Sequence, residues 1–306
     1  MILAAGLGTR LRPITGILPK PLVPVVGVPN IVRTIGRLKE AGITELVINS
    51  YHLSEVLEQT LGDGSMFGVA IAYSREKELL GTGGGIKKAL PLLGDSAFLV
   101  VNGDALFAPD IRKIIEAHKS TNALATLVVR EDPDAEKYGS VGLGADGGVC
   151  SLVGAGEKER AIKHYMFTGV HIIEPEIGKR LPDNGCIVRQ TYMPLVEEGA
   201  RLGGLPMDGY FCDLGTLERY LQSNIALVTG SARLEGVVPA PNGVFLGKNV
   251  TVGQGSHLGK GVVVGDRAQI APDTHLARTV VFPGATVKGQ VANAVVMPDG
   301  SVLRVG

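Results

Sequence analysis

Tryptophan is absent from the sequence, and aromatic residues of any kind are scarce. Phe, Trp and Tyr together make up only 5% of the 306 residues. Proteins that hold nucleic-acid bases by stacking depend on such side chains. The 30 basic and 30 acidic side chains also balance, so there is no net positive charge to attract a polyanion. We therefore expect no nucleic-acid partner.

Long apolar segments and paired cysteines are missing as well. No run approaches the roughly 18 apolar residues of a membrane span, and the opening MILAAGLGTR lacks the pattern of a signal peptide. We expect a soluble, cytoplasmic protein with no membrane partner. Cys150, Cys186 and Cys212 contain no Cys-x-x-Cys pair, which argues against a disulfide framework and against a zinc site.

Glycine, by contrast, is abundant, and the pattern around it changes near residue 235. The chain has 43 glycines, about twice the usual share. Residues 1–229 alternate predicted strands with predicted helices, such as a helix over 30–41 followed by a strand over 44–49. This predicts an α/β catalytic domain with a Rossmann-like mixed, mostly parallel sheet and helices on both faces. Ligands of such sheets bind beyond the carboxyl ends of the strands.

Residues 236–306 repeat with a period of six. The apolar positions are Leu246, Val252, Leu258, Val264, Ile270, Leu276 and Phe282. Small or β-branched residues lie four positions after each. The pattern is typical of a hexapeptide-repeat left-handed parallel β-helix with the apolar residues pointing inward. Flat parallel faces and an open last coil predict that this domain joins copies of the chain into a homo-oligomer.

A glycine loop follows the first predicted strand. Gly6 and Gly8 suggest a dinucleotide fingerprint, but Leu11 stands where the third glycine belongs and the next helix begins only at Asn30. The loop instead offers successive backbone N–H groups close to Arg10 and Lys20. This combination predicts a phosphate cradle, the alternative being a solvated surface loop.

A second glycine cluster, Gly81–Gly85, precedes a helix predicted over 86–93. Without side chains in the way, a flat base could lie against the bare peptide and be recognised by main-chain groups. The alternative is a plain linker.

Two carboxylates stand at the ends of predicted strands. Asp104 follows the strand over 97–102, and Asp213 ends a strand before a helix that Thr216 caps. Either aspartate alone could be a turn or cap residue. Together, beside a phosphate cradle, they predict a Mg²⁺ site, because carboxylates with phosphate oxygens and water are its usual ligands.

These motifs resemble one enzyme family. Gly6-Leu7-Gly8-Thr9-Arg10 with Lys20-Pro21, Gly103-Asp104 and Asp213-Leu214-Gly215-Thr216 resembles the sugar-1-phosphate nucleotidylyltransferases, or NDP-sugar pyrophosphorylases. The resemblance implies that a nucleoside triphosphate and a sugar 1-phosphate give an NDP-sugar and pyrophosphate, with Mg²⁺ as cofactor. The C-terminal repeat is similar to that of mannose-1-phosphate guanylyltransferases, which favours GTP. The segments 83–86 and 101–104 are more similar to N-acetylmuramate 1-phosphate uridylyltransferases. A uridylyltransferase acting on an N-acetylmuramate- or glucose-type 1-phosphate is therefore the alternative.

The resemblance also assigns roles to residues. Arg10, Lys20 and Asp104 are implied as catalytic, and Asp104 with Asp213 as metal ligands. The implied nucleotide-binding residues are Leu3, Ala4, Ala5, Gly6, Gly8, Thr9, Arg10, Gly83, Gly84, Asn102 and Gly103. The implied sugar-phosphate residues are Gly139, Lys158, Thr168 and Gly169. Lys158 departs from the family pattern, because Glu157-Lys158-Glu159 stands where Glu-Lys-Pro is usual.

Two other functions compete with this one. His257 and His275 lie one predicted coil apart, as they would in a hexapeptide-repeat acyltransferase that uses a histidine base. A non-catalytic regulatory subunit that binds a sugar nucleotide is the second rival. The presence of Arg10, Lys20, Asp104 and Asp213 together argues against it.

Overall fold

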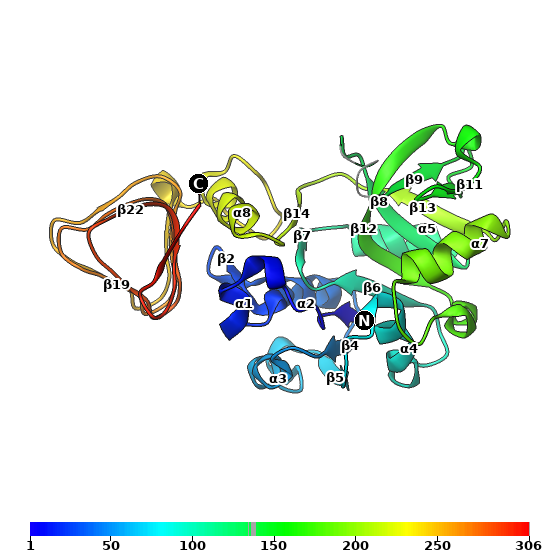
Figure 1. Ribbon diagram of the computed structural model, residues 1–306, viewed down its shortest axis with the longest axis horizontal. Helices are drawn as coiled ribbons and strands as arrows, with labels where there is room; N and C mark the ends of the chain where they lie inside the picture. The colour runs from blue at the N-terminus through cyan, green and yellow to red at the C-terminus, as the bar shows by residue number, and fades with distance from the viewer. Residues whose placement is uncertain (134, 136–138, 306) are drawn as a thin grey trace. The chain divides into compact units, whose positions relative to one another are not determined.

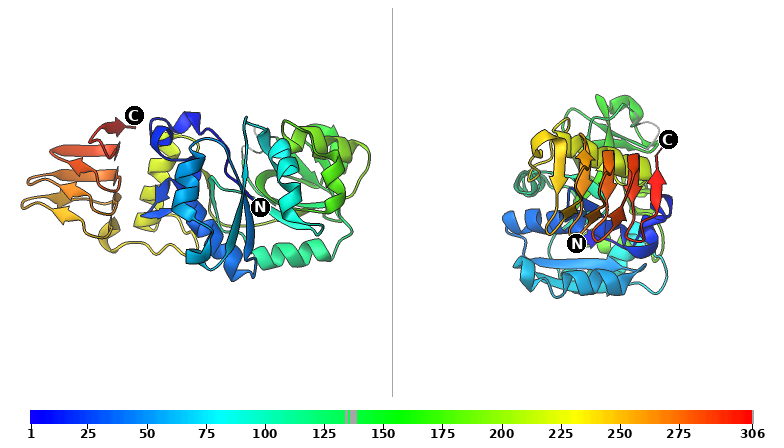
Figure 2. Two further views of the ribbon diagram at one scale, coloured as in Figure 1. Left: turned by 90° about the horizontal axis from the view of Figure 1, so that it is seen from below. Right: turned by 90° about the vertical axis from the view of Figure 1, so that its left-hand side faces the viewer.

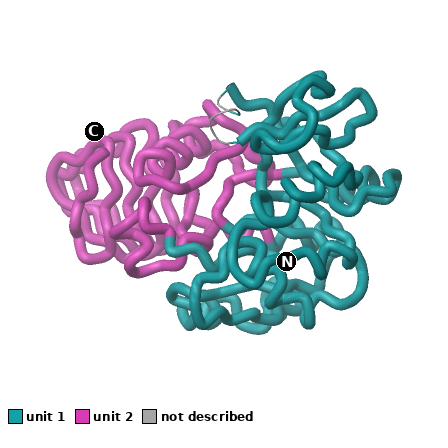
Figure 3. Tube along the Cα trace, turned by 45° about the vertical axis from the view of Figure 1, so that its right-hand side comes forward, with its two compact units in different colours: residues 1–7, 35–103, 109–208 teal, residues 8–34, 104–108, 209–306 magenta. Residues whose placement is uncertain are grey.

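The computed structural model describes residues 1–133, 135 and 139–305 (Figure 1). It divides into two compact units, each built from separate stretches of the chain (Figure 3). Unit 1 comprises Met1–Leu7, Ile35–Gly103 and Pro109–Asp208, and unit 2 comprises Gly8–Thr34, Asp104–Ala108 and Gly209–Gly306. The predicted sequence boundary near residue 235 thus lies inside unit 2.

Unit 1 is built on a ten-stranded mixed sheet. Its order is β11-β10-β9-β12-β6-β1-β4-β5, with β8 paired to β12 and β13 paired to β8. The strands β6, β1, β4 and β5 are parallel, as the alternating pattern predicts, whereas β12 is antiparallel to its neighbours. The strands are β1 Ile2–Leu3, β4 Glu45–Ser50, β5 Ala70–Arg75, β6 Phe98–Asn102, β8 Ala125–Arg130, β9 Ser140–Leu143, β10 Val149–Leu152, β11 Ala155–Gly156, β12 Lys163–Ile173 and β13 Leu202–Pro206.

The helix that periodicity predicts over 30–41 is α2 (Asn30–Glu40), which begins in unit 2 and continues into unit 1. In α2, Ile31, Ile35 and Leu38 recur at helical spacing and are all buried, and Gly42 with a φ of 90° follows the helix end. In α5 (Ile111–Lys119) the Asp110 carboxylate caps the first turn by accepting from the Lys113 amide at 3.1 Å. The other helices are α3 Ser54–Leu61, α4 Gly81–Leu93 and α7 Met193–Glu197, with a π-helical turn over Val188–Tyr192 and 3-10 turns over Ser65–Phe67, Lys158–Arg160 and Pro175–Arg180.

The second glycine cluster is helical. α4 begins at Gly81, so Gly81–Gly85 form its first turn and are neither a preceding loop nor a linker. Gly81 enters the helix with a φ of +69°, a conformation that L side chains rarely adopt.

Unit 2 combines the strand-poor segment after β1 with the C-terminal part of the chain. β7 (Ala105–Phe107) and β14 (Phe211–Asp213) form an antiparallel pair, and α8 (Leu217–Thr229) follows β14. Thr216 caps α8 by accepting from the Arg219 amide at 3.2 Å, as predicted. The remaining elements before residue 244 are the 3-10 turns Thr9–Leu11, Lys20–Leu22 and Pro241–Gly243, α1 Ile14–Ile17, β2 Pro24–Val25 and β3 Val28–Pro29.

Residues 244–304 form short strands that stack on one another (Figure 2). Seen end-on they have a three-sided outline, with β19 and β22 on different sides (Figure 1). Apart from the final pair, the strands are parallel to partners about one turn of the outline later. The strands are β15 Val244–Leu246, β16 Thr251–Val252, β17 His257–Leu258, β18 Val262–Val264, β19 Gln269–Ile270, β20 His275–Val281, β21 Thr286–Val287, β22 Gln290–Val296 and β23 Val302–Arg304.

The repeat loses its phase earlier than the sequence pattern predicts. Leu258 pairs with Leu276, 18 residues later, but Val264 pairs with Val281 and not with Phe282. The turn is shortened within β20, where Arg278 has a φ of 48°. Phe282 is nevertheless 1% exposed, because its ring packs against Tyr220 of α8 with centroids 6.2 Å apart. His257 and His275 are register partners, as their spacing predicts.

Candidate active site

Three predicted residues from distant parts of the sequence meet in unit 2. The Lys20 Nζ donates to Asp104 Oδ2 at 2.7 Å and to Asp213 Oδ1 at 2.8 Å. The Lys20 side chain is 7% exposed, whereas those of Asp104 and Asp213 are 38% and 33% exposed. A buried ammonium group is therefore held between two carboxylates that remain open to ligands.

Local structure explains why these side chains converge. Pro19 and Pro21 flank Lys20 at the start of a 3-10 turn, and the following Leu22 and Val23 are buried. Asp104 lies immediately before β7, and Asp213 pairs with Ala105 across the β7–β14 ladder, which places the two aspartates side by side. The Asn30 amide secures β7 by donating to Ala105 O at 3.0 Å.

The carboxylates determine the ionisation of Lys20. Burial alone would lower the pKa of Lys20, but the two aspartates outweigh it and hold that pKa above its ordinary value. Lys20 is therefore fully charged near neutral pH. An ammonium of this kind can donate three hydrogen bonds, two of which Asp104 and Asp213 accept here.

The predicted phosphate loop lies beside this group. Gly8 has a φ of +59°, and a Cβ added there would lie 2.8 Å from Thr15 Cγ2 and 3.3 Å from Lys20 Cβ. Its carbonyl accepts from the Thr15 hydroxyl at 2.8 Å. The loop is thus folded over the Lys20 stem and requires glycine at this position. Arg10 points outward, with its side chain 68% exposed and its Nη2 3.6 Å from Asp213 Oδ2.

The donor set fits a divalent cation. Mg²⁺ in proteins is usually bound by one or two carboxylates together with water and phosphate oxygens. Asp104 and Asp213 each present one oxygen to a common point, now taken by the Lys20 Nζ. Among the described residues there is no group of three or more His, Cys, Asp or Glu side chains that could hold a metal without other ligands. Two carboxylates that depend on a substrate to complete the coordination suit a metal that binds with phosphates.

In unit 1, several predicted nucleotide-binding residues meet at the carboxyl edge of the sheet. Leu3 and Asn102 are register partners on β1 and β6, and the Gly103 amide donates to Leu3 O at 2.9 Å. The Asn49 Oδ1 accepts from the amide of Ala4 at 2.7 Å. These strand ends form one edge, as expected for a parallel sheet.

Two buried polar residues at this edge escaped the sequence analysis. The Asn49 Nδ2 donates to Glu76 Oε1 at 2.7 Å, and Glu76 Oε2 accepts from the Leu80 amide at 2.9 Å. Asn49 is 2% and Glu76 7% exposed. The network links the loop after β1 to the start of α4, so both residues position main chain near the predicted nucleotide residues. A search for polar residues at strand ends would have found them, since Asn49 lies near the end of β4 and Glu76 follows β5.

The glycines of α4 are packed against a neighbouring segment of unit 1. A Cβ at Gly83 would lie 2.7 Å from Pro182 Cγ, and one at Gly84 would lie 2.4 Å from Asp183 O. The Gly83 amide donates to Gly185 O at 2.8 Å. Close packing therefore explains these glycines, and their role in reading a base stays a prediction.

Of the predicted sugar-phosphate residues, the structure brings Thr168 and Gly169 to the same edge of unit 1. A Cβ at Gly169 would lie 2.1 Å from the Asn102 side-chain amide nitrogen, so this glycine allows the close approach of Asn102, a predicted nucleotide-binding residue. Thr168 is buried, and its hydroxyl donates to Val128 O. Gly139 packs against Val153, with a φ of +94°. Lys158 lies exposed on the 3-10 turn 158–160.

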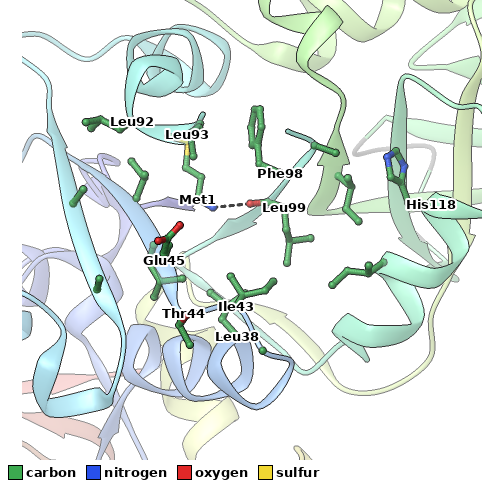
Figure 4. Close-up of a pocket in the computed structure, with 18 of the residues that line it drawn as sticks. Met1, Leu38, Ile43, Thr44, Glu45, Leu92, Leu93, Phe98, Leu99 and His118 are labelled. Atoms are coloured by element: carbon green, nitrogen blue, oxygen red, sulfur yellow. Dashed lines mark hydrogen bonds between the residues drawn. The ribbon is translucent and has the colours of Figure 1, made fainter. Parts of the chain in front are cut away.

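Unit 1 also contains a cavity of about 1080 Å³ at the opposite edge of its sheet (Figure 4). The cavity lies at the amino end of β1 and is lined mainly by apolar side chains such as Leu38, Ile43 and Leu99. The Met1 amino group donates to Leu99 O there, and burial lowers its pKa to about 5. None of the predicted site residues lines this cavity.

Comparison with known proteins identifies the family. The sequence profile described as nucleotidyl transferase matches residues 1–229. The chain belongs to this family. The prediction of a nucleotidyltransferase of the sugar-1-phosphate class is confirmed. No helix among the described residues is long and apolar enough to cross a membrane.

The relatives include enzymes of two base specificities. A mannose-1-phosphate guanylyltransferase of Mycobacterium tuberculosis is 30% identical over 292 residues, covering 94% of this chain and 80% of the relative. An N-acetylmuramate alpha-1-phosphate uridylyltransferase of Neisseria meningitidis is 39% identical over 222 residues, covering 72% of this chain and 94% of the relative. Among solved structures, HddC from Yersinia pseudotuberculosis complexed with GMP-PN has a TM-score of 0.59 and 26% identity, covering 73% of this chain and 96% of that one.

Proposed function

We propose that the protein is a mannose-1-phosphate guanylyltransferase that makes GDP-mannose and pyrophosphate from GTP and mannose 1-phosphate. The observation that carries the catalytic part is the Lys20 ammonium held between Asp104 and Asp213, next to the glycine loop. The sugar and base are supported by the guanylyltransferase relative, whose match spans 94% of the chain and so includes most of the C-terminal strands.

The proposed reaction needs charge neutralisation more than acid–base catalysis. A phosphate oxygen of the sugar 1-phosphate attacks the α-phosphorus of the triphosphate, and pyrophosphate leaves. The nucleophile is already ionised, because the second pKa of a phosphate monoester is about 6. The difficulty is to bring two polyanions together, and Lys20 and Arg10 supply positive charge and alignment for this step. Mg²⁺ held by Asp104 and Asp213 would neutralise further phosphate charge.

The other substrate-binding residues remain those that the family resemblance implies. We propose that the nucleotide is bound by Leu3, Ala4, Ala5, Gly6, Gly8, Thr9, Arg10, Gly83, Gly84, Asn102 and Gly103. Gly139, Lys158, Thr168 and Gly169 are proposed for the sugar 1-phosphate. We also propose that residues 1–229 form the catalytic domain and that residues 236–306 form a left-handed β-helix.

A uridylyltransferase is the second candidate, because the uridylyltransferase relative has the higher identity, 39%.

An assay of pyrophosphate release separates the candidates. It tests four nucleoside triphosphates, each with mannose, glucose, N-acetylglucosamine and N-acetylmuramate 1-phosphates. We expect GTP with mannose 1-phosphate to be the fastest pair. Lys20→Ala, measured alongside, should lower its turnover by about a hundredfold or more. A preference for UTP would favour the second candidate, and no release from any pair would favour a regulatory subunit.

We also propose that the C-terminal strands join copies of the chain into a homo-oligomer. Leu246 and Val252, which the repeat places inside the coil, are 46% and 43% exposed. They lie in the first coil, which has no preceding coil to cover it. The last coil is partly covered by β23, which pairs antiparallel with β22. The first coil is therefore the better surface for binding a second copy of the chain. The sequence pattern had favoured the last coil as this surface.

Charging this surface should separate the copies. We expect Leu246→Glu combined with Val252→Glu to lower the mass measured by light scattering to that of a monomer, because charges resist burial in an apolar interface. Val238→Glu is the matched control, since Val238 is 84% exposed but precedes the strands, and it should leave the mass unchanged. An unchanged mass in the double variant would place any interface elsewhere.

A further inference from the structure

The Lys20 ammonium lies at the point where the two metal-binding carboxylates face each other. It bonds to Asp104 Oδ2 and Asp213 Oδ1 at 2.7 and 2.8 Å, and its side chain is the most enclosed of the three. Two other cations, Arg10 and Arg219, approach the other oxygen of Asp213, Oδ2, at 3.6 and 3.7 Å. Lys20 bonds to one oxygen of each carboxylate.

The backbone that carries Lys20 has little freedom to move. Prolines flank Lys20, and the next two residues, Leu22 and Val23, are 3% and 0% exposed. Gly8 lies against the base of the Lys20 side chain, because a Cβ at Gly8 would be 3.3 Å from Lys20 Cβ. A change in the position of the ammonium must therefore come from rotation of its own side chain and not from a shift of the loop.

We propose that Lys20 is a counter-ion that excludes a divalent cation from Asp104 and Asp213 until a nucleotide arrives. This inference rests on the proposed function, because it assumes that the two aspartates are metal ligands. An ammonium and a divalent cation repel each other and need the same carboxylate oxygens, so they cannot occupy this point together. Phosphate oxygens give the ammonium another anionic partner and release the carboxylates. Metal and nucleotide then bind cooperatively, each raising the affinity for the other.

The first test measures metal binding without nucleotide. Mn²⁺ is titrated into wild-type protein, Lys20→Met and Arg219→Met, with free Mn²⁺ followed by electron paramagnetic resonance. We expect wild type to bind weakly and Lys20→Met to bind about tenfold more tightly or better. Arg219→Met removes the same charge near Asp213 but leaves the ammonium in place, so its gain should be clearly smaller. Tight binding by wild type, no gain in Lys20→Met, or equal gains in both variants would overturn the proposal.

A second test uses wild-type protein and decides the matter even if Lys20→Met does not fold. In protein labelled with ¹⁵N-lysine, the buried Lys20 ammonium should give a protected signal. We expect Mg²⁺ alone to leave this signal unchanged, and Mg²⁺ with non-hydrolysable GTP or UTP analogues to shift it. A shift with Mg²⁺ alone, or no shift with any analogue, would contradict the exchange. The Mn²⁺ result is independent of the pyrophosphate assay, so failure of the counter-ion role and failure of the proposed function can be told apart.

Discussion

Replacing both Asp104 and Asp213 by asparagine is expected to abolish magnesium-dependent pyrophosphate release and to destabilise the fold more than the two single changes predict. Each single variant should also lose activity, because each removes one of the two carboxylates proposed to bind Mg²⁺. Each should unfold within about 1 kcal/mol of wild type, since these side chains are partly exposed and one charged partner of Lys20 remains.

The double variant differs because of Lys20. With both carboxylates gone, an ammonium with a 7% exposed side chain keeps only neutral amide partners. Leaving a buried charge uncompensated is costly. We expect a coupling free energy of about 1 kcal/mol or more between the two sites, within the range usual for residues in contact.

Urea unfolding of wild type, both single variants and the double variant measures this coupling, and a pyrophosphate assay over a range of magnesium concentrations measures activity. Asp110→Asn is the matched control, because it makes the same chemical change at the cap of α5. The asparagine side-chain oxygen can also accept a hydrogen bond from the Lys113 amide. It should retain wild-type activity. If the double variant's change in unfolding free energy equals the sum of the two single changes, the aspartates do not jointly compensate the Lys20 charge. An active single variant would remove that residue from the proposed metal site.

The sequence predicted the members of this cluster but not their arrangement. Strand ends, glycine loops and apolar spacing are local signals, so Asp104, Asp213 and the glycine loop could be selected from them, and the limits of α2 were predicted to within one residue. That Lys20 joins the two aspartates depends on the pairing of β7 with β14, more than a hundred residues apart in the chain. Nothing in the spacing of either strand identifies its partner.

The same limitation applies to the C-terminal repeat. The six-residue repeat predicts which residues face inward in a coil that has a neighbouring coil above and below it. It does not indicate which coil is the uncovered one, and so Leu246 is exposed while Val264 is fully buried. It also does not reveal that α8 packs against these strands, where Tyr220 and Ile225 share one apolar core with Val264, Val281 and Phe282. The tail was expected to be a separate assembly domain, but in the structure it shares its core with the segments that carry the site.

Deleting residues 236–306 is therefore expected to abolish activity and to unfold much of unit 2, although every proposed catalytic residue precedes residue 230. The core that would be cut also contains Leu11, Ile14, Val23, Val25 and Leu106, which lie on the segments presenting Arg10, Lys20 and Asp104. Gly27 is packed against the Phe245 ring, which a Cβ there would approach to 2.6 Å. The truncated chain would expose these apolar side chains, and losing several such contacts at about 1.5–3 kcal/mol each is enough to exceed the roughly 5–15 kcal/mol that stabilises a typical protein.

Calorimetry and the pyrophosphate assay test this expectation, with the charged variant Leu246→Glu/Val252→Glu as the comparison. That variant should lose assembly but keep its core, because both side chains are already nearly half exposed, at 46% and 43%. We expect it to unfold cooperatively and to remain active as a monomer, whereas the truncated chain should show a weakened unfolding transition and at least a hundredfold lower turnover. A truncated chain that unfolds cooperatively and works at the wild-type rate would mean that the coils serve assembly alone. Loss of activity in the charged monomer as well would instead mean that the site depends on a second copy of the chain.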